Sequence, residues 1–362
     1  SAFLRRLTFM PKIQHDIIIG SGVAAAISAA FGAPIAGIIF AHETVLRHFS
    51  LKAITSIALS SMIANYTAIK FNIISPPLLL EKINFDIISV LSGLTLVGPL
   101  AAIVAIIFIK LLLTVSKFPN YAGLKNWQTP IIAGLACGIT GLFLDEILGL
   151  GTKTLLEVLT INLDVTFLII LLLGKLILTS LCIGLGFFGG VFSPALFLGA
   201  LVGALIYNLD FLNLDDNHLS VLAVSGMAAV SSSVIGAPIT AIILVLELTG
   251  SYDYAIAATL PVAICTFITS RTLGNSFFDK QLFSRGIEIS KGREQISLNQ
   301  LKILQFTEKT FTNFSIDTTV DQAIRKFKKT KTTEGYIIDK NSIFYGKINL
   351  LDIIDKKNGE KI

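Results

Sequence analysis

Long stretches of uncharged, apolar residues alternate with short polar segments over the first 270 residues of the chain. Three stretches reach the roughly 20 residues that a helix needs to cross a bilayer: residues 17–41, 88–109 and 220–246. Shorter apolar runs cover residues 54–69, 129–144, 165–173, 176–209 and 254–270. This pattern predicts an all-α, polytopic membrane domain.

Glycine and proline interrupt several of these stretches, at residues 32–34, 189–194 and 236–238. A bundle of simple full-length spans has no need of such breaks, whereas helices that stop midway through a membrane domain do. We therefore expect broken helices whose ends lie inside the membrane.

Two of the broken stretches are copies of one another. The segment SGVAAAISAAFGAPIAGIIFAHE, residues 21–43, aligns without gaps on SGMAAVSSSVIGAPITAIILVLE, residues 225–247, with 12 of 23 positions identical at an offset of 204. We expect two homologous halves, which in transporters commonly lie in opposite orientation about a central substrate site. The same offset places the first-half counterpart of residues 186–194 before Ser1, so we expect part of that half to lie upstream in a longer chain.

Charged residues are concentrated at the carboxyl end. Only 15% of all residues are charged, against about 25% in soluble domains. Residues 271–362 hold 17 Lys/Arg and 11 Asp/Glu, which leaves 12 and 13 for the first 270 residues. The composition excludes an ordinary soluble or disordered protein, and the net charge of +5 belongs to the tail rather than to a nucleic-acid surface. A basic tail favours the cytoplasmic side of the membrane.

The tail is predicted to be a small α+β module. Residues 315–329 have the pattern of a capped amphipathic helix, with an apolar face made of Val320, Ala323, Ile324 and Phe327. A strand, a strand and a helix are predicted for residues 335–339, 343–348 and 349–355, with a turn at residues 340–341. The basic run at residues 325–331 is either a solvated helix face or a surface for anionic lipid.

The segment GGVFSP, residues 189–194, has the composition of an anion-binding helix start. Its glycines let the backbone approach a ligand, Ser193 suits a helix N-cap and Pro194 suits the first helical position. The following helix is apolar, so its positive end would lie inside the membrane and attract an anion without a cationic side chain. Pro34 and Pro238 open two further helices in the same way. Converging N-termini favour an anion substrate; the alternative is that these residues only kink helices for packing.

The sequence shows little sign of a disulfide, a metal site or a catalytic site. Cys137, Cys182 and Cys265 lie far apart in apolar runs without metal-ligand spacing, so we expect core- or lipid-facing thiols and neither a disulfide nor a zinc site. With four histidines and no spacing typical of a catalytic site, we expect no enzyme. Lys175 interrupts an apolar run, where it would either concentrate anions near the pathway or snorkel to the membrane surface.

These motifs resemble the CLC family of chloride channels and transporters. GGVFSP is similar to the family's G-x-F-x-P motif, and both repeated segments resemble its two A-P-containing segments, in the same order. The resemblance covers residues 1–282 and implies the CLC architecture of inverted halves with broken helices, in a homodimer with one chloride pathway per subunit. After a linker at residues 283–296, residues 297–362 resemble a single CBS repeat. Because that module works in pairs, the resemblance implies an adenine-nucleotide site only where a second copy completes it.

The resemblance also implies roles for individual residues. The amides of Val191 and Phe192 would bind the central anion, with Gly190 allowing the close approach and Ser193 in the same helix start. At Phe278 the family's usual tyrosine hydroxyl is missing, so this ring would either turn its positive edge to the anion or act as a hydrophobic plug. The family's loop with the gating glutamate has no match in the chain.

Proton coupling depends on the residues that follow the first repeat. Many exchangers of the family carry two carboxylates there, the second of which transfers protons, whereas this chain has Glu43 and Thr44. Threonine has no proton to exchange near neutral pH, so His42 and Glu43 are the remaining proton-pathway candidates at this place. Because Glu43 recurs as Glu247, the other interpretation is a shared structural role, such as pairing with Arg47 or with a backbone amide.

The sequence therefore predicts a multi-pass protein of a bacterial inner membrane that exchanges chloride for protons. A passive chloride channel is the first alternative, and a secondary transporter of other small anions is the second. We expect no cofactor in the membrane domain and no nucleic-acid partner; chloride, protons and the lipid bilayer are the expected partners.

Overall fold

The structure is a computed structural model that describes residues 12–72, 85–125, 127–209, 212, 214–215, 217–274, 276–284, 311–339 and 343–354. The chain forms two compact units, Ser1–Glu288 and Ile289–Ile362, which are described separately. From residue 285 onward the expected linker lies outside the described residues, as does the turn expected at residues 340–341.

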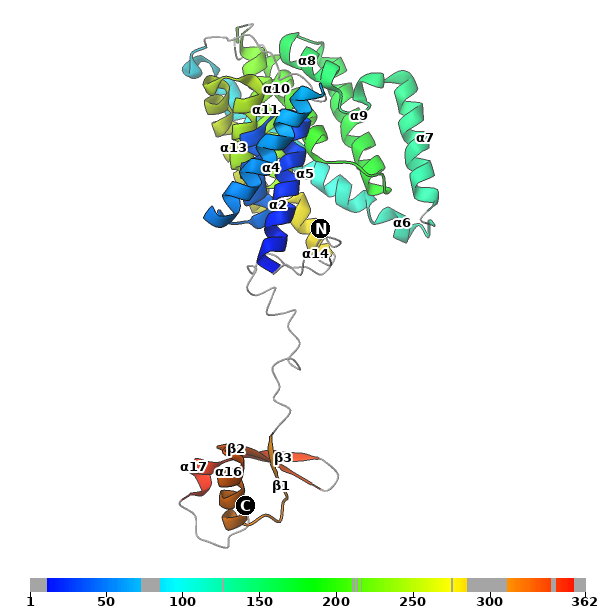
Figure 1. The fold of residues 1–362 in the computed structure, drawn as a ribbon. Helices are drawn as coiled ribbons and strands as arrows, with labels where there is room; N and C mark the ends of the chain where they lie inside the picture. Colours follow the sequence, from blue (N-terminus) through cyan, green and yellow to red (C-terminus); the bar gives the residue numbers. More distant parts are fainter. Residues whose placement is uncertain are drawn as a thin grey trace. The chain divides into compact units, whose positions relative to one another are not determined.

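The described part of the first unit is helical (Figure 1). In chain order its elements are α2 (Lys12–Phe31), α3 (Pro34–Phe40), the π-helical η1 (Ala41–Leu46), α4 (Leu51–Lys70), α5 (Ile87–Val115), α6 (Phe118–Tyr121), α7 (Gln128–Phe143), the 3-10 turn η2 (Asp145–Ile147), α8 (Thr152–Thr160), α9 (Val165–Gly184), α10 (Phe192–Tyr207), α11 (His218–Ile235), α12 (Pro238–Thr249), α13 (Tyr252–Leu273) and α14 (Phe277–Ser284). Among the described residues, four helical stretches are long and apolar enough to cross a membrane: α5, α9, α11 and the stretch Tyr252–Ser284. The predicted apolar stretches are therefore helices.

The two repeated segments are broken in the same way, as the sequence predicts. Gly32 ends α2 with a φ of 65°, and Gly236 ends α11 with a φ of 80°. Such left-handed angles strain any residue with a Cβ atom, so glycine suits the end of the first helix. Pro34 and Pro238 then start α3 and α12, where the missing N–H group costs no hydrogen bond.

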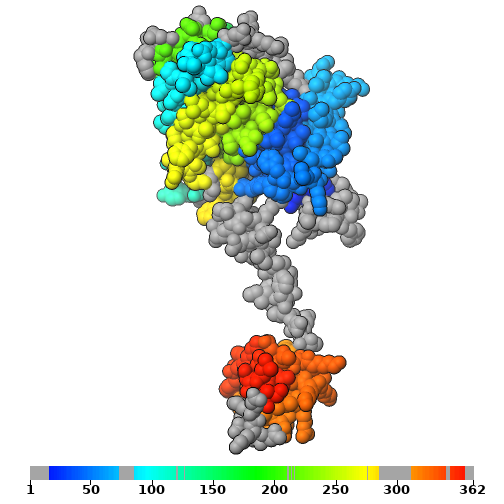
Figure 2. Space-filling view, turned by 90° about the vertical axis from the view of Figure 1, so that its left-hand side faces the viewer, coloured from blue at the N-terminus to red at the C-terminus, as the bar shows by residue number. Residues whose placement is uncertain are grey.

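The two halves pack directly against each other. Helix α3 of the first half contacts α12 of the second, and the space-filling view shows the blue first-half helices against yellow-green and yellow second-half helices (Figure 2). Helix α11 is buried along its whole length. It meets α10 through glycines, because a Cβ on Gly199 would clash with the backbone of Gly226 and a Cβ on Gly203 with that of Leu222. These small residues allow the two backbones to approach closely, which fixes the position of α10.

The second unit contains a three-stranded sheet with a helix against it. Its elements are β1 (Thr312–Phe314), α16 (Val320–Thr330), β2 (Glu334–Ile338), β3 (Phe344–Asn349) and α17 (Leu350–Ile353). The sheet order is β1-β2-β3, with β1 parallel to β2 and β2 antiparallel to β3. The predicted helices and two strands are confirmed, and the apolar face of α16 packs with Phe314 in a small core. The short strand β1 was not predicted, since three residues carry too little alternation to be recognised.

Candidate functional site

The start of α10 has no side-chain cap from the described part of the chain. The chain leaves α9, turns at Gly186 with a φ of 102°, and enters α10 at Phe192. Val191 is the N-cap, so the prediction of Ser193 at that position was wrong; Ser193 and Pro194 lie in the first turn, where proline's missing N–H costs nothing. Among the described residues no side chain caps this end, and its amides are available to a ligand.

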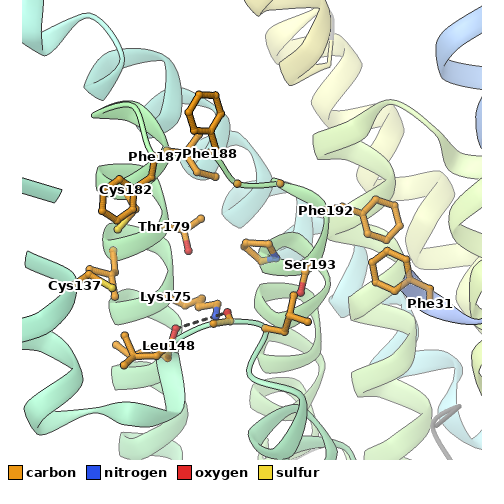
Figure 3. Close-up of a pocket in the computed structure, with 18 residues that line it drawn as sticks. Phe31, Cys137, Leu148, Lys175, Thr179, Cys182, Phe187, Phe188, Phe192 and Ser193 are labelled. Carbon is orange, nitrogen blue, oxygen red and sulfur yellow. Dashed lines mark hydrogen bonds between the residues drawn. The ribbon is translucent and has the colours of Figure 1, made fainter. Parts of the chain in front are cut away.

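A pocket of about 480 Å³ opens in front of this helix start (Figure 3). Gly190, Phe192 and Ser193, three of the residues predicted to bind an anion, line it together. The side chain of Val191 is buried in the core instead. The remaining lining residues are Phe31, Cys137, Ile147, Leu148, Gly149, Leu150, Lys175, Leu178, Thr179, Cys182, Ile183, Phe187, Phe188, Gly189 and Pro194.

Lys175 places a positive charge in the pocket wall. Its side chain is only 2% exposed, so of the two alternatives left by the sequence, snorkelling to the membrane surface is excluded. The Nζ atom donates hydrogen bonds of 2.9 Å to the carbonyl oxygens of Ile147 and of Gly149 and lies 4.9 Å from the centre of the Phe197 ring. These partners offset the cost of burying an ammonium group, and the residue still lines the pocket.

Phe278 lies near the candidate anion residues but outside the pocket. It packs in one apolar cluster with Phe192, Phe40 and Ile235, and its ring centre is 5.5 Å from that of Phe277. It is held there by the start of α14, where Asp279 forms an ion pair with Arg47 of the first half. These two residues are 232 positions apart, and no local sequence signal predicts their contact.

Glu43 and Glu247 each cap the start of a helix in the other half. Glu43 accepts hydrogen bonds from the amides of Ile239 (3.1 Å) and Thr240 (2.9 Å) and from the Thr240 hydroxyl (2.6 Å) at the start of α12. Glu247 accepts from the amides of Ile35 (2.8 Å) and Ala36 (2.7 Å) at the start of α3.

The expected pairing of these glutamates with backbone amides is therefore confirmed, while Arg47 contacts Asp279 instead. The backbone contacts of the two glutamates obey the 204-residue offset, so the halves are related by an approximate two-fold axis. They also correct an expectation: carboxylates of the chain already occupy the N-termini of α3 and α12. Of the three helix starts, only that of α10 is free for an external anion.

The other two proton-pathway candidates flank Glu43 in η1. His42 is 1% exposed, its Nδ1 lies 3.0 Å from the carbonyl oxygen of Ile38, and its ring stacks on Phe49. Within the described ranges, His42 Nε2 and Thr44 Oγ1 are buried without a hydrogen-bond partner. The structure thus brings His42, Glu43 and Thr44 together but places none of them on the α10 pocket.

Two of the three cysteines are not simple core- or lipid-facing residues. Cys137 of α7 and Cys182 of α9 are half-buried and pack against the core as expected, but they also line the pocket. Only Cys265 is fully buried. The sequence could not indicate the pair, because its members lie on different helices whose packing no local pattern predicts.

Comparison with known proteins places these features in context. Residues 1–270 match the family model described as voltage gated chloride channel. The chain is 32% identical over 304 residues to the H(+)/Cl(-) exchange transporter ClcA of Vibrio parahaemolyticus, covering 80% of this chain and 65% of that protein. It is 31% identical over 286 residues to ClcA of Salmonella agona, covering 75% of this chain and 58% of the relative. The chain thus spans less than two thirds of the length of these relatives.

Solved structures agree on the fold. A slow cyanobacterial Cl-/H+ antiporter superposes with a TM-score of 0.64 at 22% identity, covering 74% of this chain and 64% of the other. A CLC-type fluoride/proton antiporter superposes with a TM-score of 0.60 at 24% identity, covering 70% and 63%. These likenesses establish the overall fold of the membrane unit.

Proposed function

This chain belongs to the voltage-gated chloride channel (CLC) family, and from that premise we propose that it exchanges chloride for protons across a membrane. The observation that carries the proposal is the uncapped start of α10 facing a pocket of about 480 Å³. The N-terminal ends of α3 and α12 are closed by glutamates, so of these three helix starts only that of α10 remains for an external anion.

The anion is bound by backbone groups. The amides of Val191 and Phe192 and the helix dipole of α10 stabilise it, and Gly190 and Ser193 allow it to approach the backbone. Lys175 raises the local anion concentration without forming a fixed ion pair, because two carbonyl groups already hold its ammonium. Phe278 borders the site through its contact cluster with Phe192.

Exchange is favoured over passive conduction by the names of the relatives, which are H(+)/Cl(-) exchange transporters. Thr44 offers no titratable proton, so protons take a route through other groups. His42 is the candidate, since its Nε2 is buried and has no hydrogen-bond partner among the described residues. Glu43 is the weaker candidate because both of its oxygens hold the start of α12.

Reconstitution into liposomes tests the proposal. An outward chloride gradient should drive protons inward against their own gradient, and the protonophore-treated control should lose that movement. Chloride flux without proton pumping would favour the passive channel instead, and carboxylate uptake without chloride flux would favour a different anion transporter. The proposal is transport and includes no catalysed reaction.

The protein is an integral membrane protein, as its family and apolar helices require. We place it in a bacterial inner membrane as a homodimer with the basic tail in the cytoplasm, in line with the positive-inside tendency. A cysteine introduced at Lys328 should react with a membrane-impermeant reagent only after the membrane is opened. Chemical cross-linking of the protein in membranes should give dimers.

The second unit is a candidate regulatory module. Its β1-α16-β2-β3-α17 order supports the likeness to a single CBS repeat, and a pair of such repeats would bind an adenine nucleotide. Calorimetric titration of the protein with ATP should release heat only where a second repeat is supplied; no heat with a complete pair would remove this role.

A further inference from the structure

The pocket wall carries a pair of thiols that anion transport does not require. Cys137 on α7 and Cys182 on α9 both line the pocket. Figure 3 shows the two side chains on the same wall, one from each helix. Deprotonated thiols are preferred ligands of soft metal ions, so two thiols on the same pocket wall offer a place for one such ion between them.

The number of ligands restricts the identity of the ion. In the part of the chain that the structure describes, no group of three or more His, Cys, Asp or Glu side chains is gathered. Structural zinc takes four ligands, whereas Cu+ is a soft ion that two thiolates satisfy. Binding releases both thiol protons: one Cu+ and two thiols give a bis-thiolate complex with one negative charge and two H+.

Lys175 supplies the opposite charge. Its side chain lines the same pocket as the two thiols, and the carbonyl groups of Ile147 and Gly149 accept two of the three N–H bonds of its ammonium. A buried charge is stabilised by a partner of opposite sign. The bis-thiolate complex of Cu+ and the ammonium sum to zero, whereas Hg2+ with the same thiolates leaves the ammonium unbalanced.

We infer that Cys137 and Cys182 form a Cu+ site in the wall of the anion pocket, with Lys175 as its counter-charge. The ion would share its cavity with Gly190, Phe192 and Ser193, so occupation obstructs the anion's approach to α10. The obstruction rests on the proposed function; the binding of Cu+ does not.

Anaerobic titration of the purified, reduced protein with Cu+ against a chromophoric chelator tests the site. Wild type and Cys265→Ser should each bind one Cu+, because Cys265 is buried away from the pocket and accepts a hydrogen bond from Ser233. Cys137→Ser and Cys182→Ser should bind it more than about tenfold more weakly. Lys175→Met should weaken Cu+ but not Hg2+, while Lys175→Arg keeps both. Equal affinity in wild type and the Cys137 and Cys182 variants overturns the site.

A reversible thiol reagent tests the site in the wild-type protein, without variants that could fail to fold. Phenylarsine oxide condenses with two neighbouring thiols and releases water, so treated wild type should lose Cu+ binding and regain it with excess dithiol. Unchanged Cu+ binding after arsenical labelling contradicts the site. In liposomes Cu+ should slow chloride flux through wild type and spare Cys137→Ser. If the proteins bind Cu+ but neither wild type nor any variant transports chloride, the proposed function is wrong and the Cu+ site remains supported.

Discussion

At the scale of single residues, Glu43 and Glu247 explain how a charge-poor membrane domain holds two broken helices. Each carboxylate accepts amide N–H groups from the first turn of a helix in the other half. Those amides have no partner within their own helix, and a negative charge at a helix N-terminus is favourable. The structural interpretation of the repeated glutamate thus has a direct physical basis.

Replacing these glutamates tests that role. Glu43→Gln and Glu247→Gln should each lower the free energy of unfolding by about 1–3 kcal/mol, because an amide keeps one acceptor oxygen but loses the charge. Unfolding of each variant in increasing concentrations of a denaturing detergent measures this decrease in the free energy of unfolding. The ratio of protons to chloride transported should not change; a Glu43→Gln protein of wild-type stability that transports chloride without protons would assign Glu43 to the proton pathway instead.

Lys175 is predicted to act on anion binding rather than on turnover. Lys175→Met should raise the chloride concentration for half-maximal flux by roughly tenfold, the effect of a favourable interaction near 1.4 kcal/mol. Lys175→Arg should retain most of the affinity, and Lys153→Met, an exposed lysine of α8, serves as the control. A lower maximal flux with unchanged half-saturation would mean that Lys175 only supports the fold.

At the scale of elements, the close approach of α10 and α11 decides where the anion site lies. Gly199→Ala should destabilise the protein by on the order of 1–3 kcal/mol, because its Cβ meets the backbone of Gly226 and neither helix has room to move. Gly138→Ala in α7 is the matched control, since nothing lies within 4 Å of its Cβ. Equal stability of the two variants, measured by thermal unfolding, would contradict the close packing.

The ion pair of Arg47 and Asp279 is predicted to position α14 and so Phe278. Arg47→Asp should move Phe278 away from Phe192 and alter anion selectivity, because the pair joins the end of η1 to the first turn of α14. Adding Asp279→Arg should restore the wild-type chloride to nitrate ratio in flux assays. A double variant no better than the single one would show that the pair has no positioning role.

The sequence predicts the elements well and their contacts only in part. Apolar stretches, the glycine and proline breaks and the repeat offset specify the helices of both halves, because each feature is local or periodic. The caps at Glu43 and Glu247 could be foreseen as one of two interpretations, since the repeat makes them equivalent. The Arg47 and Asp279 pair, the two pocket thiols and the buried position of Lys175 depend on packing between distant helices, which no local pattern contains.

At the scale of the whole molecule, the packing of the two halves holds the N-terminal end of α10 in place. Carboxylates of the chain close α3 and α12, glycines fix α10 against α11, and of these three helix starts that of α10 keeps its amides free at a pocket. An anion pathway built from backbone amides needs few cationic side chains, which agrees with the low charge of the membrane unit.

The most direct test of this account is a crystal structure with bromide in place of chloride, examined by anomalous diffraction. The account predicts an anomalous peak at the start of α10, beside the amides of Val191 and Phe192, and none at the starts of α3 and α12. Bromide at the capped ends of α3 or α12, or an empty α10 start in crystals that bind bromide elsewhere in the membrane unit, would contradict it.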